Sequence, residues 1–217
     1  MPLKPIKTKN RVDIIKKDAQ KAYHYARYRR KKRWPAAEPI ILKNPEIAIE
    51  YALNVVKNRW PEVEPIFLKD GKLALEYAKK FFKGKGWPEA EPLMLKDAQD
   101  AYSYAYYFKQ GKWPEALPVY MKDPQTAFVY ARDHLHKRWP EAEKYIINDP
   151  HWALEYAKKF FKGKGWPEAE PNIIKDPHYA TDYAVNVLKR RWPEAEPTIM
   201  KYAGTGGYYN TQLPKKK

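Results

Sequence analysis

Residues 74–92 read ALEYAKKFFKGKGWPEAEP, and residues 153–171 repeat the same nineteen letters. The two copies lie 79 residues apart, and the shorter stretches Asp18-Ala19-Gln20 and Asp97-Ala98-Gln99 are separated by the same interval. A block copied in tandem reproduces its own nearest-neighbour contacts, so whole units can be added without disturbing the rest. The duplication therefore indicates a chain that grew by repetition.

The duplicated stretch belongs to a shorter repeat that runs through most of the chain. Tryptophan followed by proline recurs at intervals of 26 or 27 residues, at Trp34, Trp60, Trp87, Trp113, Trp139, Trp166 and Trp192. Most of these open a variant of the phrase W-P-E-A-E-P, and Asp-Pro or a variant such as Asn44-Pro45 comes ten residues after the tryptophan. Self-similarity at such a period is typical of a helical array.

Each unit contains the signals of two helices. Asp or Asn is a strong N-cap, and a following proline fits the first helical position. Apolar residues then recur at i, i+3, i+4 and i+7, as in Ala74, Tyr77, Ala78 and Phe81, which is the spacing of one buried helical face. Glycine follows this stretch, where a helix C-terminus favours positive φ, at Gly84, Gly111 and Gly163.

The other helix of each unit is short and begins near Trp-Pro. Glutamates lie in its first turn, where the helix dipole favours carboxylates, and an apolar trio such as Ile40-Ile41-Leu42 fills it. A second proline, as in Pro65 or Pro92, lacks a backbone donor and predicts a looser turn at its start.

These patterns predict an all-α fold, an α-solenoid of short antiparallel helix pairs with 26–27 residues per repeat, because one pair cannot bury its apolar face alone. We expect a basic N-terminal arm over 1–17, a solenoid over 18–201 and a flexible basic tail over 202–217. The solenoid opens with a cap helix over 18–33, and a repeat starts near each of the seven tryptophans. In the cap helix, Arg29 and Arg30 replace apolar residues of the later helices, as a solvent-facing cap requires.

The charge is concentrated at the ends of the chain. The formal net charge is +16, and residues 1–33 hold thirteen Lys and Arg against Asp13 and Asp18, so the body of the chain is nearly neutral. The absence of cysteine excludes disulfides, thiolate metal sites and cysteine nucleophiles. No apolar run approaches the length of a membrane span, so no membrane partner is expected.

No singular constellation of catalytic residues occurs. Ser103 is the only serine, and His134 and His136 are two residues apart, so on a helix they point away from each other, unlike a metal-binding pair at i and i+4. Gly84-Lys85-Gly86 lacks the preceding strand of a phosphate loop. The glutamates recur in almost every unit, whereas acid–base carboxylates are singular and differ in environment. We therefore expect no enzyme activity, no cofactor and no metal.

Two kinds of binding function fit the pattern, and the sequence leaves both open. The first is a non-catalytic interaction module for a protein or nucleoprotein complex, because the position before each core tyrosine varies from unit to unit, as a particular protein surface requires. The second is a sequence-independent nucleic-acid binder that uses phosphate-pairing cations beside an aromatic ring. The alternative structural role of the loop cations is to complement the negative end of the preceding helix.

The same basic residues would make contact under either hypothesis. The first group is the cap cluster, residues 27–33, which consists of Arg27, Tyr28, Arg29, Arg30, Lys31, Lys32 and Arg33. The second group lies in the loops before the later tryptophans and consists of Arg59, Lys85, Lys112, Arg138, Lys164, Arg190 and Arg191. Tyr102, Tyr106 and Tyr107 fall outside the main apolar stripe and are expected to expose ring faces.

The phrase R-W-P-E-A-E-P with D-P-x-x-A-x-x-Y-A occurs at residues 138–143 with 149–157, and at 191–197 with 176–184. It resembles tandem helical repeats of uncharacterised proteins from tailed bacteriophages and related bacterial loci. The likeness covers residues 18 to about 201 and brings no catalytic residues with it. The resemblance implies a phage origin, a location in the cytoplasm of a bacterial host, and a partner that is a host or phage protein, nucleoprotein, DNA or RNA.

Overall fold

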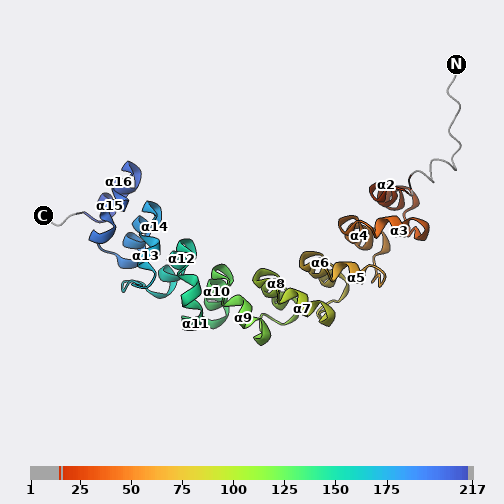
Figure 1. Ribbon diagram of the computed structural model, residues 1–217, viewed down its shortest axis with the longest axis horizontal. Coiled ribbons are helices and arrows are strands. Elements are labelled where there is room, and N and C mark those ends of the chain that lie inside the picture. Colours follow the sequence, from red (N-terminus) through yellow and green to blue (C-terminus); the bar gives the residue numbers. More distant parts are fainter. Residues whose placement is uncertain (1–14, 16, 215–217) are drawn as a thin grey trace, which may run out of the picture. The chain divides into compact units, whose positions relative to one another are not determined.

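The computed structural model describes residue 15 and residues 17–214 (Figure 1). Over this range the predicted all-α fold of repeated helix pairs is confirmed, and no strand occurs among the described residues. The short helices are α3 (Glu38–Ile41), α5 (Glu64–Phe67), α7 (Glu91–Met94), α9 (Leu117–Tyr120), α11 (Pro140–Ile146), α13 (Glu170–Ile173) and α15 (Glu196–Ile199). The longer helices are α2 (Ala19–His24), α4 (Pro45–Tyr51), α6 (Gly71–Phe81), α8 (Ala98–Phe108), α10 (Pro124–Tyr130), α12 (Pro150–Phe160), α14 (Pro177–Asp182) and α16 (Ala203–Gln212).

The caps of these helices follow the sequence signals. The side chain of Asp70, for example, accepts a hydrogen bond from the Leu73 amide at 3.1 Å, and Asn44 does the same for Ile47 at 3.0 Å. Such a bond satisfies one of the amides that the first turn of a helix leaves unpaired. The looser start of the short helices is also confirmed, because α3, α7, α9 and α15 each follow a 3₁₀ turn whose first residue is proline.

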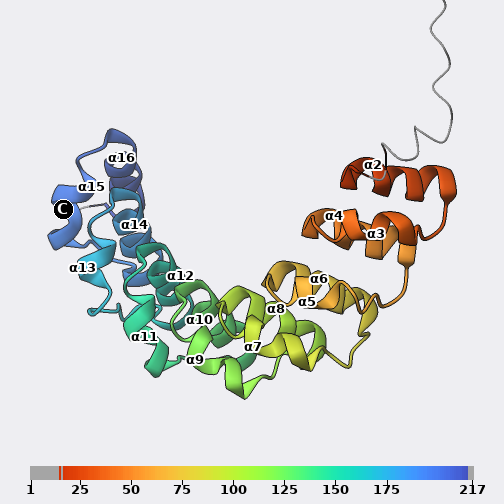
Figure 2. The same ribbon diagram turned by 45° about the vertical axis from the view of Figure 1, so that its right-hand side comes forward.

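The chain divides into two compact units, Met1–Lys112 (unit 1) and Trp113–Lys217 (unit 2), where the sequence predicts one continuous solenoid. In unit 1 the longer helices α2, α4, α6 and α8 pack side by side in chain order, and in unit 2 the same holds for α10, α12, α14 and α16 (Figures 1 and 2). Within each unit, every repeat therefore covers the apolar face of its neighbour.

Tryptophan, tyrosine and small residues make the core of both units. Trp60, Trp87 and Trp166 are almost completely buried, as are six core tyrosines: Tyr51, Tyr77, Tyr104, Tyr156, Tyr183 and Tyr209. Alanines such as Ala74 and Ala78 flank these tyrosines and are fully buried. Because alanine is small, neighbouring helices can approach closely enough for the large rings to interlock.

The difference between repeats of 26 and 27 residues lies in one loop. The tyrosine always comes seventeen residues after its tryptophan, whereas the next tryptophan follows nine or ten residues later. The two longer loops end α6 and α12 with Gly84 and Gly163 at φ of 75° and 76°. Four of the shorter loops follow a turn of π-helix instead: Tyr25–Arg30, Ala52–Val56, Ala131–Leu135 and Tyr183–Leu188. A π turn holds an extra residue within the helix, so the loop can be shorter.

The C-terminal end differs from the expectation. Residues 202–217 were expected to be a flexible tail, but Ala203–Gln212 form α16, which packs on α14 and α15. Three glycines give this helix a poor intrinsic propensity, and its stability comes from packing. Tyr209 is fully buried, and the Thr205 hydroxyl donates to the Ile199 carbonyl at 2.7 Å. The expected N-terminal arm lies, apart from residues 15 and 17, outside the described residues.

Candidate functional site

A hydrogen-bond network recurs around the tryptophans. The Trp60 amide donates to the Tyr77 hydroxyl at 2.5 Å, and this hydroxyl donates to Oε1 of Glu64 at 3.1 Å. The same arrangement occurs at Trp34–Tyr51–Glu38, Trp87–Tyr104–Glu91, Trp139–Tyr156–Glu143, Trp166–Tyr183–Glu170 and Trp192–Tyr209–Glu196. The recurring glutamates therefore have a structural role that the sequence did not reveal, which is to accept a hydrogen bond from the hydroxyl of the core tyrosine.

The rings of four of these tyrosines also contact the tryptophan of the following repeat. Tyr51 packs on the ring of Trp60 with 5.3 Å between centroids, and Tyr156 packs on Trp166 at 5.2 Å. Tilted aromatic pairs at this distance are favourable beyond the area that they bury. One tyrosine thus joins two consecutive Trp-Pro turns, the earlier one through its hydroxyl and the later one through its ring.

Burial raises the pKa of these tyrosine hydroxyls. The pKa of Tyr51 rises to about 12, chiefly because burial disfavours the phenolate, and the neighbouring Glu38 carboxylate adds to the rise. The pKa values of Tyr77, Tyr104, Tyr156 and Tyr183 are raised from the same main cause. The hydroxyls remain protonated donors over the physiological pH range, so they hold the carboxylates in place.

The arginine before the tryptophan completes the network in four repeats. Arg59 donates from Nε and from one terminal nitrogen to the two oxygens of Glu64, at 2.9 and 2.8 Å. Arg33 and Arg138 bind Glu38 and Glu143 in the same two-pronged way. Arg191 donates to Glu196 at 2.6 Å from Nε. The hydrogen bond to the carboxylate raises the pKa of Arg59, and the positive charge of Arg59 is therefore paired with Glu64 of its own repeat.

All four of these arginines also lie over aromatic rings, Arg33 over that of Trp60 and Arg191 over that of Tyr209. The guanidinium of Arg59 lies 4.4 Å from the centre of the Phe82 ring, and Phe82 stacks on Trp87. Arg138 lies 4.1 Å from the ring centre of Phe161, which stacks on Trp166 of the following repeat. Each guanidinium thus forms hydrogen bonds to a glutamate along its edge and stacks on an aromatic ring with its face, so it stabilises the loop. Arg33, Arg59, Arg138 and Arg191, all predicted contact residues, therefore have partners within the chain.

The repeat that begins at Trp113 departs from the pattern. Leu117 occupies the position of the glutamate, so Tyr130 has no carboxylate to bond at that position. The pKa of Tyr130 is raised by burial alone. This repeat keeps the ring contact with the next tryptophan, since Tyr130 and Trp139 lie 5.4 Å apart.

Four cations of the cap cluster have no carboxylate partner within the described chain. Arg29, Arg30, Lys31 and Lys32 are exposed, and none of them forms an ion pair with another residue of the described chain. Arg27 differs from these four, because it bonds the Tyr23 hydroxyl and lies 3.7 Å from Glu50 of the next repeat.

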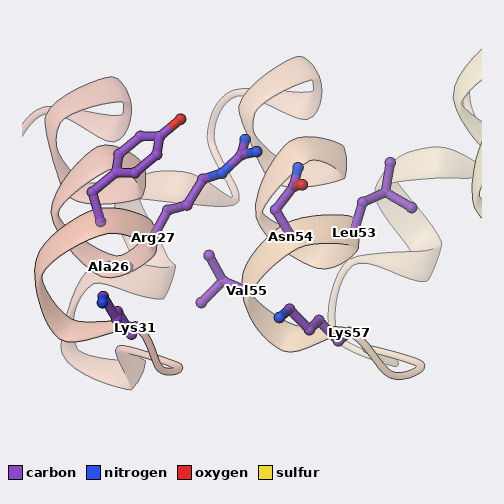
Figure 3. Close-up of a pocket in the computed structure, with 8 residues that line it drawn as sticks. Ala26, Arg27, Lys31, Leu53, Asn54, Val55 and Lys57 are labelled. Atoms are coloured by element: carbon purple, nitrogen blue, oxygen red, sulfur yellow. The ribbon is translucent and has the colours of Figure 1, made fainter.

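A groove lies beside the cap cluster, between the π turns that follow α2 and α4. Its volume is about 520 Å³, and it is lined by Ala26, Arg27, Tyr28, Lys31, Leu53, Asn54, Val55 and Lys57. Figure 3 shows Arg27 reaching toward Asn54 on one side of Val55, with Lys31 and Lys57 near the opposite end of the groove. The Tyr28 ring is 60% exposed, as expected from the sequence. The groove therefore combines an apolar floor with cations and an accessible aromatic ring.

Two polar residues of this groove, Asn54 and Lys57, are not among the contact residues predicted from the sequence. The signal for Lys57 was present, because it follows Lys31 by one repeat of 26 residues and occupies the same position relative to the tryptophan. Asn54 gave no such signal, and only the packing of α4 against α2 places its amide next to Tyr23, at 3.3 Å from the hydroxyl.

The remaining predicted loop residues are scattered over both units. Lys85, Lys112, Lys164 and Arg190 are exposed, and none of them forms an ion pair with a described residue. Of the predicted exposed tyrosines, Tyr106 and Tyr107 have exposed rings, while Tyr102 is half-buried. The structure brings the residues of the cap cluster together in one place.

The helix positions before the core tyrosines serve contacts between repeats in two cases. Glu50 accepts a hydrogen bond from the Tyr23 hydroxyl at 3.0 Å, and Asp182 lies 2.6 Å from the ammonium of Lys158. Each bond links consecutive longer helices of one unit. Part of the variation at these positions is therefore explained by contacts inside the chain.

The two histidines His134 and His136 each have a partner within the chain. His134 stacks on the Tyr130 ring at 5.1 Å, and Nδ1 of His136 lies 3.0 Å from the Arg132 carbonyl. Among the described residues, no group of three or more His, Cys, Asp or Glu could hold a metal ion. In the same part of the chain, no helix has the length and apolar character needed to cross a membrane.

Comparison with known proteins yields no match of any kind. No protein-family model, no curated protein and no solved structure matches the chain.

Proposed function

We propose that the chain is a non-catalytic repeat module that binds a host or phage protein or nucleoprotein complex by occlusion or scaffolding, and that the cap cluster makes the contact. The observation that carries the proposal is the contrast between two sets of charges. The arginine directly before the tryptophan is bonded to a glutamate of its own repeat in four repeats, whereas Arg29, Arg30, Lys31 and Lys32 are exposed and form no ion pair within the described chain. Exposed, unpaired cations clustered at one end suit an anionic partner surface.

The recurring tyrosine, glutamate and arginine side chains support a non-catalytic role. Each set satisfies a backbone amide and a carboxylate in the same way in several repeats. Catalytic groups are typically singular and differ from one another in environment. A repeated, fully bonded network stabilises a scaffold, and the work of the protein then falls to the surface that the scaffold presents.

Affinity capture tests this proposal with three versions of the full chain. The wild type is compared with a cap variant, Arg29→Ser, Arg30→Ser, Lys31→Ser and Lys32→Ser, and with a charge-matched control, Lys43→Ser, Lys69→Ser, Lys96→Ser and Lys122→Ser. The control residues are also exposed and lie at the ends of short helices. Each version is immobilised and exposed to bacterial lysate, with and without nuclease treatment.

We expect one partner to be retained by the wild type and the control and lost by the cap variant. Retention after nuclease treatment would identify a protein, and loss would identify a nucleoprotein or nucleic acid. The proposal is wrong if the cap variant retains the same molecules as the wild type, or if the wild type retains none above bare resin.

A second candidate function is sequence-independent binding of nucleic acid through the cap and the basic loops. The exposed Tyr28 ring beside the cap cations favours it, because stacking and phosphate pairing together hold single strands. The ion pairs of Arg33, Arg59, Arg138 and Arg191 argue against a continuous basic edge along the loops.

A further inference from the structure

The residue three positions before each tryptophan has a left-handed backbone in all seven repeats. The φ values are 54° at Lys31, 58° at Lys57, 75° at Gly84, 52° at Gln110, 54° at His136, 76° at Gly163 and 54° at Lys189. This conformation ends the longer helix and turns the chain toward the Trp-Pro segment. We call this residue the turn position.

Glycine is the residue that this conformation favours, since a Cβ atom is strained at positive φ. The chain itself uses glycine in two repeats, and a Cβ added at Gly84 or Gly163 would meet no atom within 4 Å. The turn position therefore accepts glycine and also has room for a side chain. Five repeats nevertheless carry a strained side chain there, which points to a use for the side chain itself.

In unit 1 the side chains near the turn positions are mainly lysines. Lys31 and Lys57 occupy the first two turn positions, and Lys83 and Lys85 stand on either side of Gly84 at the third. All four are exposed, and none forms an ion pair with a described residue. We call these four residues the lysine row. Because α2, α4 and α6 pack side by side, successive turns follow one another at the helix spacing of about 8–10 Å.

The groove described above lies between the first two members of the row. Lys31 and Lys57 line it from consecutive repeats, and Tyr28 and Asn54 add an aromatic ring and an amide (Figure 3). The one carboxylate that the contacts place beside it, Glu50, is already bonded to Asn54 at 2.8 Å and to Tyr23 at 3.0 Å. No described carboxylate is bonded to Lys31 or Lys57, so an incoming anion would meet two lysines that have no ion-pair partner in the described chain.

Unit 1 also carries a larger net positive charge than unit 2. Residues 17–112 contain twenty Lys and Arg against twelve Asp and Glu, whereas residues 113–214 contain fourteen against thirteen. The turn positions of unit 2 carry His136, Gly163 and Lys189 rather than consecutive lysines. The excess charge and the lysine row thus belong to the same unit.

We propose that the lysine row of unit 1 binds the phosphate backbone of a single-stranded nucleic acid, with a base stacked on Tyr28 beside the groove. Cations repeated at a constant interval along one edge match a polymer whose charge also repeats, whereas a folded protein presents charges at irregular spacing. The exposed Tyr28 ring selects a single strand, because a duplex keeps its bases stacked inside. This inference rests on the second candidate function proposed above, and it names the residues and the kind of strand that this function would use.

The test uses the full chain and a fluorescein-labelled dT20 strand, an equivalent U20 strand and a 20-base-pair duplex, with anisotropy measured across a salt series. The central variant is Lys31→Gly with Lys57→Gly, which removes two row lysines and relieves two left-handed residues. The control, Lys189→Gly with Lys201→Ser, removes two exposed lysines from unit 2, one of them at a turn position. Thermal unfolding of each variant is measured alongside.

We expect the central variant to bind dT20 or U20 about tenfold more weakly than the wild type near 100 mM salt, with a log–log salt slope shallower by about 1.4, since each phosphate contact on a single strand contributes about 0.7. Its Tm should be equal to or higher than that of the wild type, and the control should bind within about twofold of the wild type. A cap whose lysines only complement the helix dipole would instead lose Tm when they are removed.

Several outcomes would overturn the inference: wild-type chain that binds none of the three probes at 100 mM salt, a central variant that binds as tightly as the wild type, or a control that weakens binding equally. Tighter binding of the duplex than of either strand would overturn the single-strand assignment. If cap-dependent capture from nuclease-treated lysate persists while the row is dispensable, the inference fails and the proposed function stands. If neither capture nor oligonucleotide binding is seen, both fail.

Discussion

The Trp60 amide and the Tyr77 hydroxyl meet at 2.5 Å, although they are seventeen residues apart and lie in different parts of the repeat. The hydroxyl in turn donates a hydrogen bond to Glu64, so one phenol pairs a buried backbone donor with a carboxylate. A buried amide without a partner is costly, and the start of a Trp-Pro turn offers it no backbone acceptor. The tyrosine is therefore the element that holds the short helix to the longer one.

Removal of the Tyr77 hydroxyl should lower the stability of the fold. Tyr77→Phe leaves the ring packing intact but strands the Trp60 amide and one bond of Glu64, so the free energy of unfolding should fall by about 1–3 kcal/mol. Urea unfolding monitored by tryptophan fluorescence measures the loss. Tyr130→Phe is the matched control, because Leu117 replaces the carboxylate in that repeat, and its cost should stay below about 0.5 kcal/mol. Equal costs for the two variants would show that the network is not what stabilises the repeat.

Stability should fall at alkaline pH. Burial raises the pKa of Tyr51 to about 12 and raises those of the equivalent tyrosines, so the folded state keeps protons that the unfolded chain loses above its ordinary pKa near 10. The stabilisation is complete below pH 10 and is lost as the pH rises from 10 toward 12, at up to about 1.4 kcal/mol per pH unit for each such tyrosine. Tm measured from pH 8 to 11.5 should bend downward near pH 10. In Tyr77→Phe, the fall of Tm with pH above pH 10 should be less steep, because one of the contributing tyrosines is missing. An unchanged slope would contradict this account.

The left-handed turn position predicts opposite effects for two substitutions. Lys189→Gly removes a strained side chain at φ 54° and should raise stability by about 1 kcal/mol. Gly163→Ala introduces the same strain at φ 76° without a clash and should lower stability by about 1 kcal/mol. Thermal unfolding of the two variants checks both signs. Destabilisation by Lys189→Gly would mean that the lysine side chain contributes more to the fold than its backbone strain costs.

Arg59 should matter for stability and not for binding an anion. The double variant Arg59→Gln with Glu64→Gln keeps the net charge and removes the ion pair, so oligonucleotide affinity should stay within about twofold of the wild type. The same variant should lower the free energy of unfolding by about 1 kcal/mol, because the Tyr77 hydroxyl loses a charged acceptor and Phe82 loses its covering guanidinium. Anisotropy and urea unfolding on one sample separate the two effects. A tenfold loss of affinity for the oligonucleotide would show that Arg59 takes part in binding.

The C-terminal helix should behave as part of the fold of unit 2. Tyr209→Ala removes a fully buried ring that bonds the Trp192 amide at 2.7 Å, so the free energy of unfolding should fall by about 3 kcal/mol. Tyr208→Ala changes the adjacent, half-exposed side chain and should cost less than about 0.5 kcal/mol. Calorimetry of both variants makes the comparison. If the two Tm values coincide, residues 203–212 do not stabilise the unit.

Several features of the fold followed from local sequence alone. Asp70 and the other caps, the buried face of Ala74, Tyr77 and Ala78, and the positive φ at Gly84 all depend on residues within one or two turns of each other. Interactions of this range are repeated whenever the sequence is repeated, so the period predicted the helices and the core. The exposed cap cluster also followed from composition, because cations replace apolar residues on one helix only.

Other features depended on atoms that only the packed chain brings together. The bond between Tyr77 and Glu64 joins two helices, and the groove between Lys31 and Lys57 joins two repeats. Helix α16 is the clearest case, since its glycines oppose helix formation and the burial of Tyr209 outweighs them. The sequence by itself determined the period, the helix ends and the core residues, because these are short-range properties. The tertiary structure decided which charges are bonded and which remain free, because that depends on distances between segments that no local pattern encodes.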